Sequence, residues 1–153
     1  MKIRFALAVA ASLAAFPAAA QVTVSDAWVR STVPAQKATG AFMKVKSDSE
    51  AKLVSAASPV AKVVEVHEMS MKDNVMQMRA VDSLALPAGK TVELKPGGYH
   101  VMLMELVKPI DAGAAVPITL TFVGKDGKKF TQEVKAEARA PGDDGSKHKG
   151  HKH

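Results

Sequence analysis

The sequence predicts an all-β domain, built as an antiparallel β-sandwich with Greek-key connections. Short apolar runs separated by turn residues recur from Val22 to about Ala136, and no segment keeps the 3.6-residue period of an amphipathic helix. Several runs instead alternate between apolar and polar residues, which is the period of a half-buried strand. Eight or nine strands at this spacing are typical of a sandwich.

The expected strands cover residues 22–30, 40–46, 53–57, 63–71, 75–81, 91–94, 99–106, 116–122 and 130–136. The last two are the best defined. Apolar residues occupy every second position from Val116 to Phe122, and Lys125-Asp126-Gly127-Lys128 follows. An Asp-Gly pair favours a two-residue hairpin turn, so the next strand should return beside this one.

A second hairpin is expected at Lys72-Asp73-Asn74, which would bring Met76 and Met78 back beside the preceding strand. Side chains two residues apart share one face of a strand. Two such sets are His67, Met69 and Met71, and His100, Met102 and Met104. The two sets converge only if the strand 99–106 lies near this hairpin.

Residues 1–20 are expected to be a cleaved signal peptide. Lys2 and Arg4 supply a positive start, an apolar stretch follows, and Ala18-Ala19-Ala20 forms a cleavage site before Gln21. An uncleaved anchor is the alternative, but the apolar run is short for a membrane span. Cleavage leaves one domain, residues 21–140, for which we expect a periplasmic location and no later membrane span.

Composition excludes several classes of function. The mature chain has a formal charge of +4, from 19 Lys and Arg against 15 Asp and Glu, and its basic residues form no block with aromatics. Nucleic-acid binding is therefore not supported. The chain has no cysteine, which excludes a thiolate-bound blue-copper centre.

Residues 141–153 contain no apolar side chain that could join a core, so we expect a disordered tail. The tail holds three histidines, His148, His151 and His153, interrupted by Lys and Gly. Imidazoles on a mobile segment can wrap a Cu(II) or Zn²⁺ ion, which makes this a candidate second metal site. A merely solvated end and an added purification tag are the alternatives.

Two histidines and two methionines fit a soft-metal site. His67, Met78, His100 and Met102 follow one another as H-x10-M-x21-H-x-M. Six of the eight methionines lie between residues 69 and 104, next to the only histidines outside the tail. Thioether sulfur suits Cu(I) and imidazole suits copper generally.

Each of these residues also has a structural explanation. Methionine in a strand usually fills gaps in the core, and Met43, Met71, Met76 and Met104 are best explained so when each is taken singly. Trp28, Phe42 and Tyr99 are expected to be core or rim aromatics. The crowding of methionines around both histidines favours a metal site, for which Met69 is an additional candidate ligand.

The chain resembles the PCuAC-type periplasmic copper chaperones, which have a cupredoxin-like sandwich. Their H-x10-M-x21-H-x-M signature is matched at every interval. The flanking segments D-A-W-V-R (26–30), T-G-A-F-M (39–43), V-E-V-H-E-M-S-M (64–71) and P-G-G-Y-H-V-M-L-M (96–104) are similar as well. The resemblance covers about residues 21–137 and implies that His67, Met78, His100 and Met102 bind one Cu(I).

The resemblance also implies delivery of copper to an acceptor such as the copper-centre subunit of cytochrome oxidase, beside a Sco-type protein. A copper buffer or resistance protein would share every ligand. A copper enzyme is the other alternative, but Gln21 replaces the N-terminal histidine of a histidine brace, and His67 and His100 cannot form a hydrolytic triad with the residues available. We therefore expect a carrier.

Overall fold

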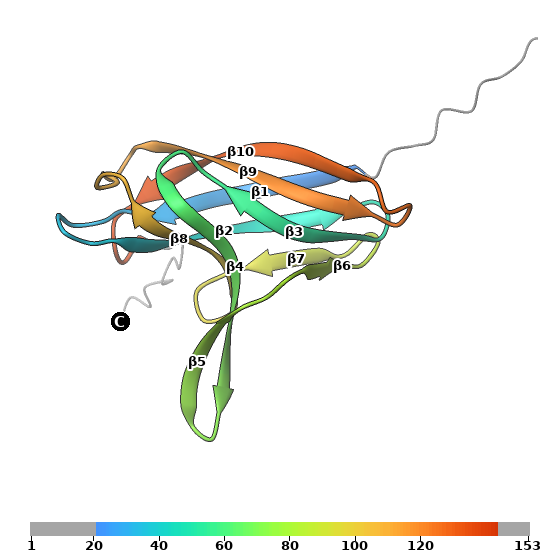
Figure 1. The fold of residues 1–153 in the computed structure, drawn as a ribbon, viewed down its shortest axis with the longest axis horizontal. Coiled ribbons are helices and arrows are strands. Elements are labelled where there is room, and N and C mark those ends of the chain that lie inside the picture. The colour runs from blue at the N-terminus through green and yellow to red at the C-terminus, as the bar shows by residue number, and fades with distance from the viewer. Residues whose placement is uncertain (1–20, 144–153) are drawn as a thin grey trace, which may run out of the picture.

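The computed structural model describes residues 21–143 and consists of ten β-strands (Figure 1). The strands are β1 (Val22–Arg30), β2 (Ala38–Ser47), β3 (Ala51–Ala57), β4 (Ala61–Lys72), β5 (Val75–Ala80), β6 (Leu84–Leu86), β7 (Thr91–Leu94), β8 (Tyr99–Leu106), β9 (Ala115–Gly124) and β10 (Lys129–Arg139). The predicted all-β sandwich is confirmed. None of the described residues belongs to a helix long and apolar enough to cross a membrane.

The strands follow the order β5-β4-β8-β2-β1-β10-β9-β3-β6, with β7 pairing with β2 beyond the end of β8. One strand pair departs from the predicted antiparallel arrangement, because β1 and β10 run parallel. Their pairing joins the first and last strands of the domain, Trp28 lying opposite Glu137 and Arg30 opposite Arg139. Nearly the whole domain lies between these two strands in the sequence, so no local hairpin constrains their relative direction.

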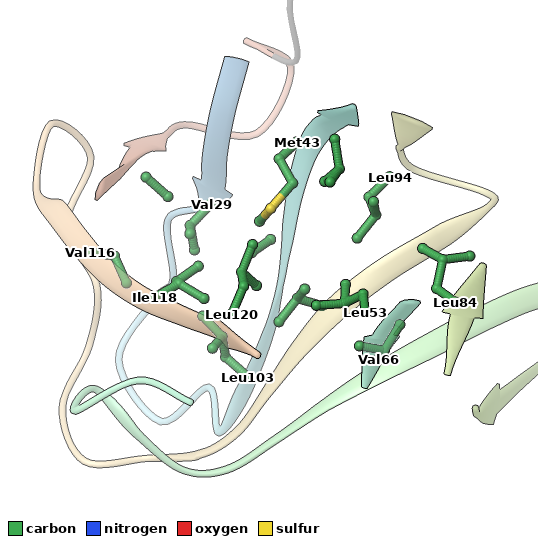
Figure 2. Close-up of a cluster of buried hydrophobic side chains, with 14 of the residues drawn as sticks. Val29, Met43, Leu53, Val66, Leu84, Leu94, Leu103, Val116, Ile118 and Leu120 are labelled. Atoms are coloured by element: carbon green, nitrogen blue, oxygen red, sulfur yellow. The ribbon is translucent and has the colours of Figure 1, made fainter. Parts of the chain in front are cut away.

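The core lies between the strand layers and draws side chains from every strand except β5 (Figure 2). On β9 the alternation gives a fully buried row, from Val116 through Ile118 and Leu120 to Phe122. The predicted hairpin after this row is confirmed, since β10 returns antiparallel. Its turn is longer than the two-residue turn expected, because Gly127 N–H donates to the carbonyl of Gly124 and only Gly127, with a φ of 78°, is left-handed. Met43 lies in the core at 2% exposure, as predicted.

The β4–β5 hairpin projects from the body of the sandwich (Figure 1). Its turn residues Asp73 and Asn74 have φ values of 52° and 61°, which is the left-handed pair that a type I′ hairpin turn requires. The predicted hairpin is thus confirmed. Every residue of β5 is exposed, so this strand forms an edge of the sheet.

Two further differences from the sequence prediction concern a short strand and the exposure of two methionines. The three-residue strand β6, which pairs with β3, was not expected because Leu84–Leu86 is too short to show a period. Met71 and Met76 are exposed, at 64% and 46%, so the expectation that they fill the core is wrong. The signal-peptide prediction (1–20) and the histidines of the expected tail lie outside the described residues.

Candidate metal site

His67 and His100 lie directly opposite one another on the paired strands β4 and β8. Directly opposed residues of an antiparallel pair point to the same face. Their ring centroids are 5.7 Å apart, and Val66 and Val101, one residue along each strand, enter the core on the other face. The strand pairing on which the predicted site depended is therefore present.

His100 is buried, with 4% of its surface exposed. Its Nδ1 lies 3.2 Å from the carbonyl oxygen of Gly98. Because a carbonyl only accepts hydrogen bonds, Nδ1 donates and Nε2 carries the lone pair. Burial lowers the pKa of His100; the hydrogen bond to Gly98 opposes the shift, and nearby His67 and Arg30 add to it. The ring is thus held in the neutral form that binds metal.

His67 is held by a carboxylate. Its Nε2 lies 2.8 Å from Oε2 of Glu65, the residue two positions earlier on the same strand face. A carboxylate accepts the proton of Nε2, which leaves the lone pair of the neutral ring on Nδ1. That Nδ1 atom is buried and has no hydrogen-bond partner. A buried polar atom without a partner is unusual, and a metal ion would satisfy it.

A pocket of about 270 Å³ brings the sulfur donors together. Met78 from β5 and Met102 from β8 line it, beside His100. Met69 lines it as well, because it lies opposite Met78 in the hairpin. His67 does not line this pocket; it lies beside His100, with its side chain 12% exposed.

The wall of the pocket opposite the hairpin comes from β2. Gly40 lies opposite Met102, and the ring of Phe42 covers Gly40, 4.6 Å from the Trp28 ring and 6.3 Å from the His100 ring. The Arg30 guanidinium lies 5.4 Å from the centre of the Phe42 ring. Aromatic packing therefore flanks His100, and the buried Phe42 also lines the pocket.

The donor set fits a soft cation. Two neutral imidazoles and two or three thioethers suit Cu(I), whereas hard cations need oxygen ligands. Among the described residues, no group of three or more His, Asp or Glu side chains could hold a metal. The sequence motif identifies four candidate ligands but not Glu65 and Gly98, which orient the histidines. Their positions two residues before each histidine were the available signal.

Comparison with known proteins identifies the family of this chain. Residues 22–136 match the family described as "Putative lipoprotein LpqE-like". "Putative lipoprotein Lxx21020" from Leifsonia xyli subsp. xyli is 36% identical over 102 residues. That match covers 66% of this chain and 61% of the relative, so the chain spans under two thirds of the relative's length.

Solved structures are similar over most of the chain. The copper-bound PCuAC domain from PmoF2 is 24% identical, with a TM-score of 0.61, and the match covers 78% of this chain and 93% of that one. Apo-DR1885 from Deinococcus radiodurans is 31% identical, with a TM-score of 0.57, and covers 91% of this chain and 93% of its own. Its Cu(I) form is 32% identical, with a TM-score of 0.56, over 84% and 83% of the two chains. The chain therefore belongs to the LpqE-like family and has the fold of PCuAC domains, as the histidine and methionine motif predicted.

Proposed function

We propose that this protein is a copper chaperone that binds one Cu(I) through His67, Met78, His100 and Met102. The observation that carries the proposal is the buried Nδ1 of His67, which lacks a partner beside the His100 ring. A Cu(I) ion would satisfy this atom, and Met78 and Met102 supply sulfur from the adjoining pocket. The similar Cu(I) form of DR1885, 32% identical to this chain, supports this choice of metal.

The chemistry suits carrying an ion rather than catalysing a reaction. Neither thioether nor neutral imidazole must lose a proton when the ion binds or leaves. Met78 is 47% exposed, so a partner can approach the site from the hairpin side. Ligands can then be exchanged one at a time between the two proteins.

The acceptor that we propose is the copper-centre subunit of cytochrome oxidase, with a Sco-type protein as a further partner. We also propose export to the periplasm by a cleaved signal peptide, a location outside the cytoplasm that the lipoprotein names of the family and relative support. His148, His151 and His153, which lie outside the described residues, would form the second site for Cu(II).

A chelator-competition titration tests the binding step. Replacing both Met78 and Met102 with Leu should weaken Cu(I) binding strongly. Met43→Leu also removes a sulfur, but from the core, and should leave Cu(I) binding unchanged. Equal affinities for the two variants would refute the ligand assignment.

Transfer separates a chaperone from a copper buffer. The copper-loaded protein is mixed with an apo copper-centre domain of cytochrome oxidase, and the metal content of each is measured after separation. Rapid transfer to this domain, faster than to an unrelated protein of similar Cu(I) affinity, supports the chaperone. Release at the same rate to both would favour a buffer.

A further inference from the structure

The β4–β5 hairpin has one sulfur-rich neutral face and one polar face. Cross-strand register places the residues in pairs: His67 with Ala80, Glu68 with Arg79, Met69 with Met78, Ser70 with Gln77, Met71 with Met76, and Lys72 with Val75. Alternate pairs point to opposite faces. All charged side chains of these pairs therefore lie on one face, where Arg79 contacts Glu68 at 2.9 Å, and all four methionines lie on the other.

The two methionine pairs occupy the positions of closest side-chain approach. Met69 N–H donates to the carbonyl of Gly98, away from β5, whereas Val66 accepts from Val81 on the β5 side. Even-numbered residues of β4 thus bond β5, and the odd-numbered ones do not. The methionine pairs are non-hydrogen-bonded, a geometry in which opposed Cα atoms lie only about 4.5 Å apart.

Core packing does not explain the pair Met71 and Met76, which is the methionine pair nearer the hairpin turn. Met71 is 64% exposed and Met76 is 46% exposed, on a part of the hairpin that projects from the sandwich (Figure 1). Isolated exposed apolar residues are common on protein surfaces. Here, however, two identical soft donors face each other, one row beyond Met69 and Met78, which line the pocket.

We propose that Met71 and Met76 form a second Cu(I) position on the hairpin, outside the pocket. This inference rests on the proposed function for the identity of the metal. The rows are two residues apart along the strand, or about 6.8 Å at about 3.4 Å per residue. An ion that leaves the pocket toward the hairpin turn would therefore find a second pair of thioethers at this distance.

The second position should bind more weakly than the pocket. Two thioethers offer fewer donors than two thioethers and two imidazoles, and exposure lets water compete for the ion. Weak binding at an exposed position suits transfer, because an incoming partner can replace water and then sulfur. The polar face of the same hairpin remains free while the ion is held.

The test uses the full-length protein with ¹³C-labelled methionine methyl groups, titrated with Cu(I) under reducing conditions. The first equivalent should shift the methyl signals of Met78 and Met102, and the second those of Met71 and Met76. In a Met71→Leu, Met76→Leu double variant, the first equivalent should bind as before, and chelator competition should show that the second equivalent is no longer bound. Met43→Leu, a matched loss of sulfur in the core, should leave both steps unchanged.

The outcomes separate this inference from the proposed function. If Met78 and Met102 shift but Met71 and Met76 stay still with excess Cu(I), the second position does not exist and the pocket stands. If only Met71 and Met76 shift, the hairpin binds Cu(I) and the pocket assignment fails. If the double variant still binds the second equivalent with wild-type affinity in chelator competition, the ion binds elsewhere and the inference is overturned.

Discussion

Glu65 accepts a hydrogen bond from His67 over 2.8 Å, and this contact determines which nitrogen of His67 faces the site. Without the carboxylate, the ring could rotate or adopt the other tautomer, and Nδ1 would no longer be held in place. Glu65→Ala should therefore weaken Cu(I) binding by about 10- to 100-fold, the usual effect of losing a group that orients a metal ligand. Chelator competition measures the change.

Glu133→Ala is the matched control, because Glu133 is an exposed carboxylate on β10. It should leave Cu(I) affinity unchanged. If the two variants bind Cu(I) equally well, Glu65 does not position His67.

Gly40 should not tolerate a side chain. A Cβ at this position would lie 2.9 Å from Cζ of Phe42, too close for the ring to stay where it is. Gly40→Ala should destabilise the domain by about 1–3 kcal/mol, as overpacking commonly does. Thermal unfolding measures the change in stability. The stability of the Gly40→Ala, Phe42→Leu double variant should lie closer to that of Phe42→Leu alone than the sum of the two single effects predicts.

The apo domain should lose stability in mild acid because of His100. Burial lowers the pKa of this histidine in the folded state, whereas the unfolded chain has the ordinary value of about 6.5. As pH falls, the unfolded state takes up the proton first, so stability present above about pH 6.5 is lost as pH falls through the folded-state pKa. His100→Gln should show a flatter dependence in denaturant titrations across this range, and an unchanged slope would contradict the assignment.

Met69 and Met78 face each other across the hairpin, and both line the pocket. The motif assigns the ligand role to Met78, so Met78→Leu should weaken Cu(I) binding much more than Met69→Leu. Leucine keeps the apolar volume and removes only the sulfur. Equal losses in a competition titration would mean that Met69 is also a ligand.

Removing residues 141–153 should leave the thermal stability of the apo domain nearly unchanged, because the last strand ends at Arg139. The first Cu(I) equivalent should still bind, since the motif residues all precede the cut. A Cu(II) equivalent should be lost, because His148, His151 and His153 supply nitrogen donors that Cu(II) prefers. Equal Cu(II) stoichiometry for the full chain and a version ending at Ala140 would show that the tail binds none.

Local patterns predicted those parts of the structure that local geometry controls. Alternation identified β9, and the turn residues Asp126-Gly127 and Asp73-Asn74 identified both hairpins. The parallel pairing of β1 with β10 could not be predicted, because it joins strands separated by nearly the whole domain. Sequence period carries no information about that direction.

The residues of the candidate site could be predicted from the sequence, but their burial could not. The motif named His67 and His100, and the strand faces aligned them with the methionines. The interval pattern could not show that the Nδ1 of His67 is buried without a partner, because that depends on how β4 pairs with β8 and sets His67 beside His100. Nor could it show that Met71 and Met76 are exposed, since methionine suits both core and surface.

The exposure of the hairpin sulfurs makes the protein sensitive to oxidants. Peroxide converts accessible methionine to its sulfoxide, which replaces a soft sulfur donor with a polar S=O group. Met71, Met76 and Met78 are 46% to 64% exposed, whereas Met43 is 2% exposed and sheltered in the core. Mild oxidation should therefore modify the hairpin first, including the proposed ligand Met78, and leave the folded sandwich intact, so that loss of the proposed metal binding precedes loss of structure.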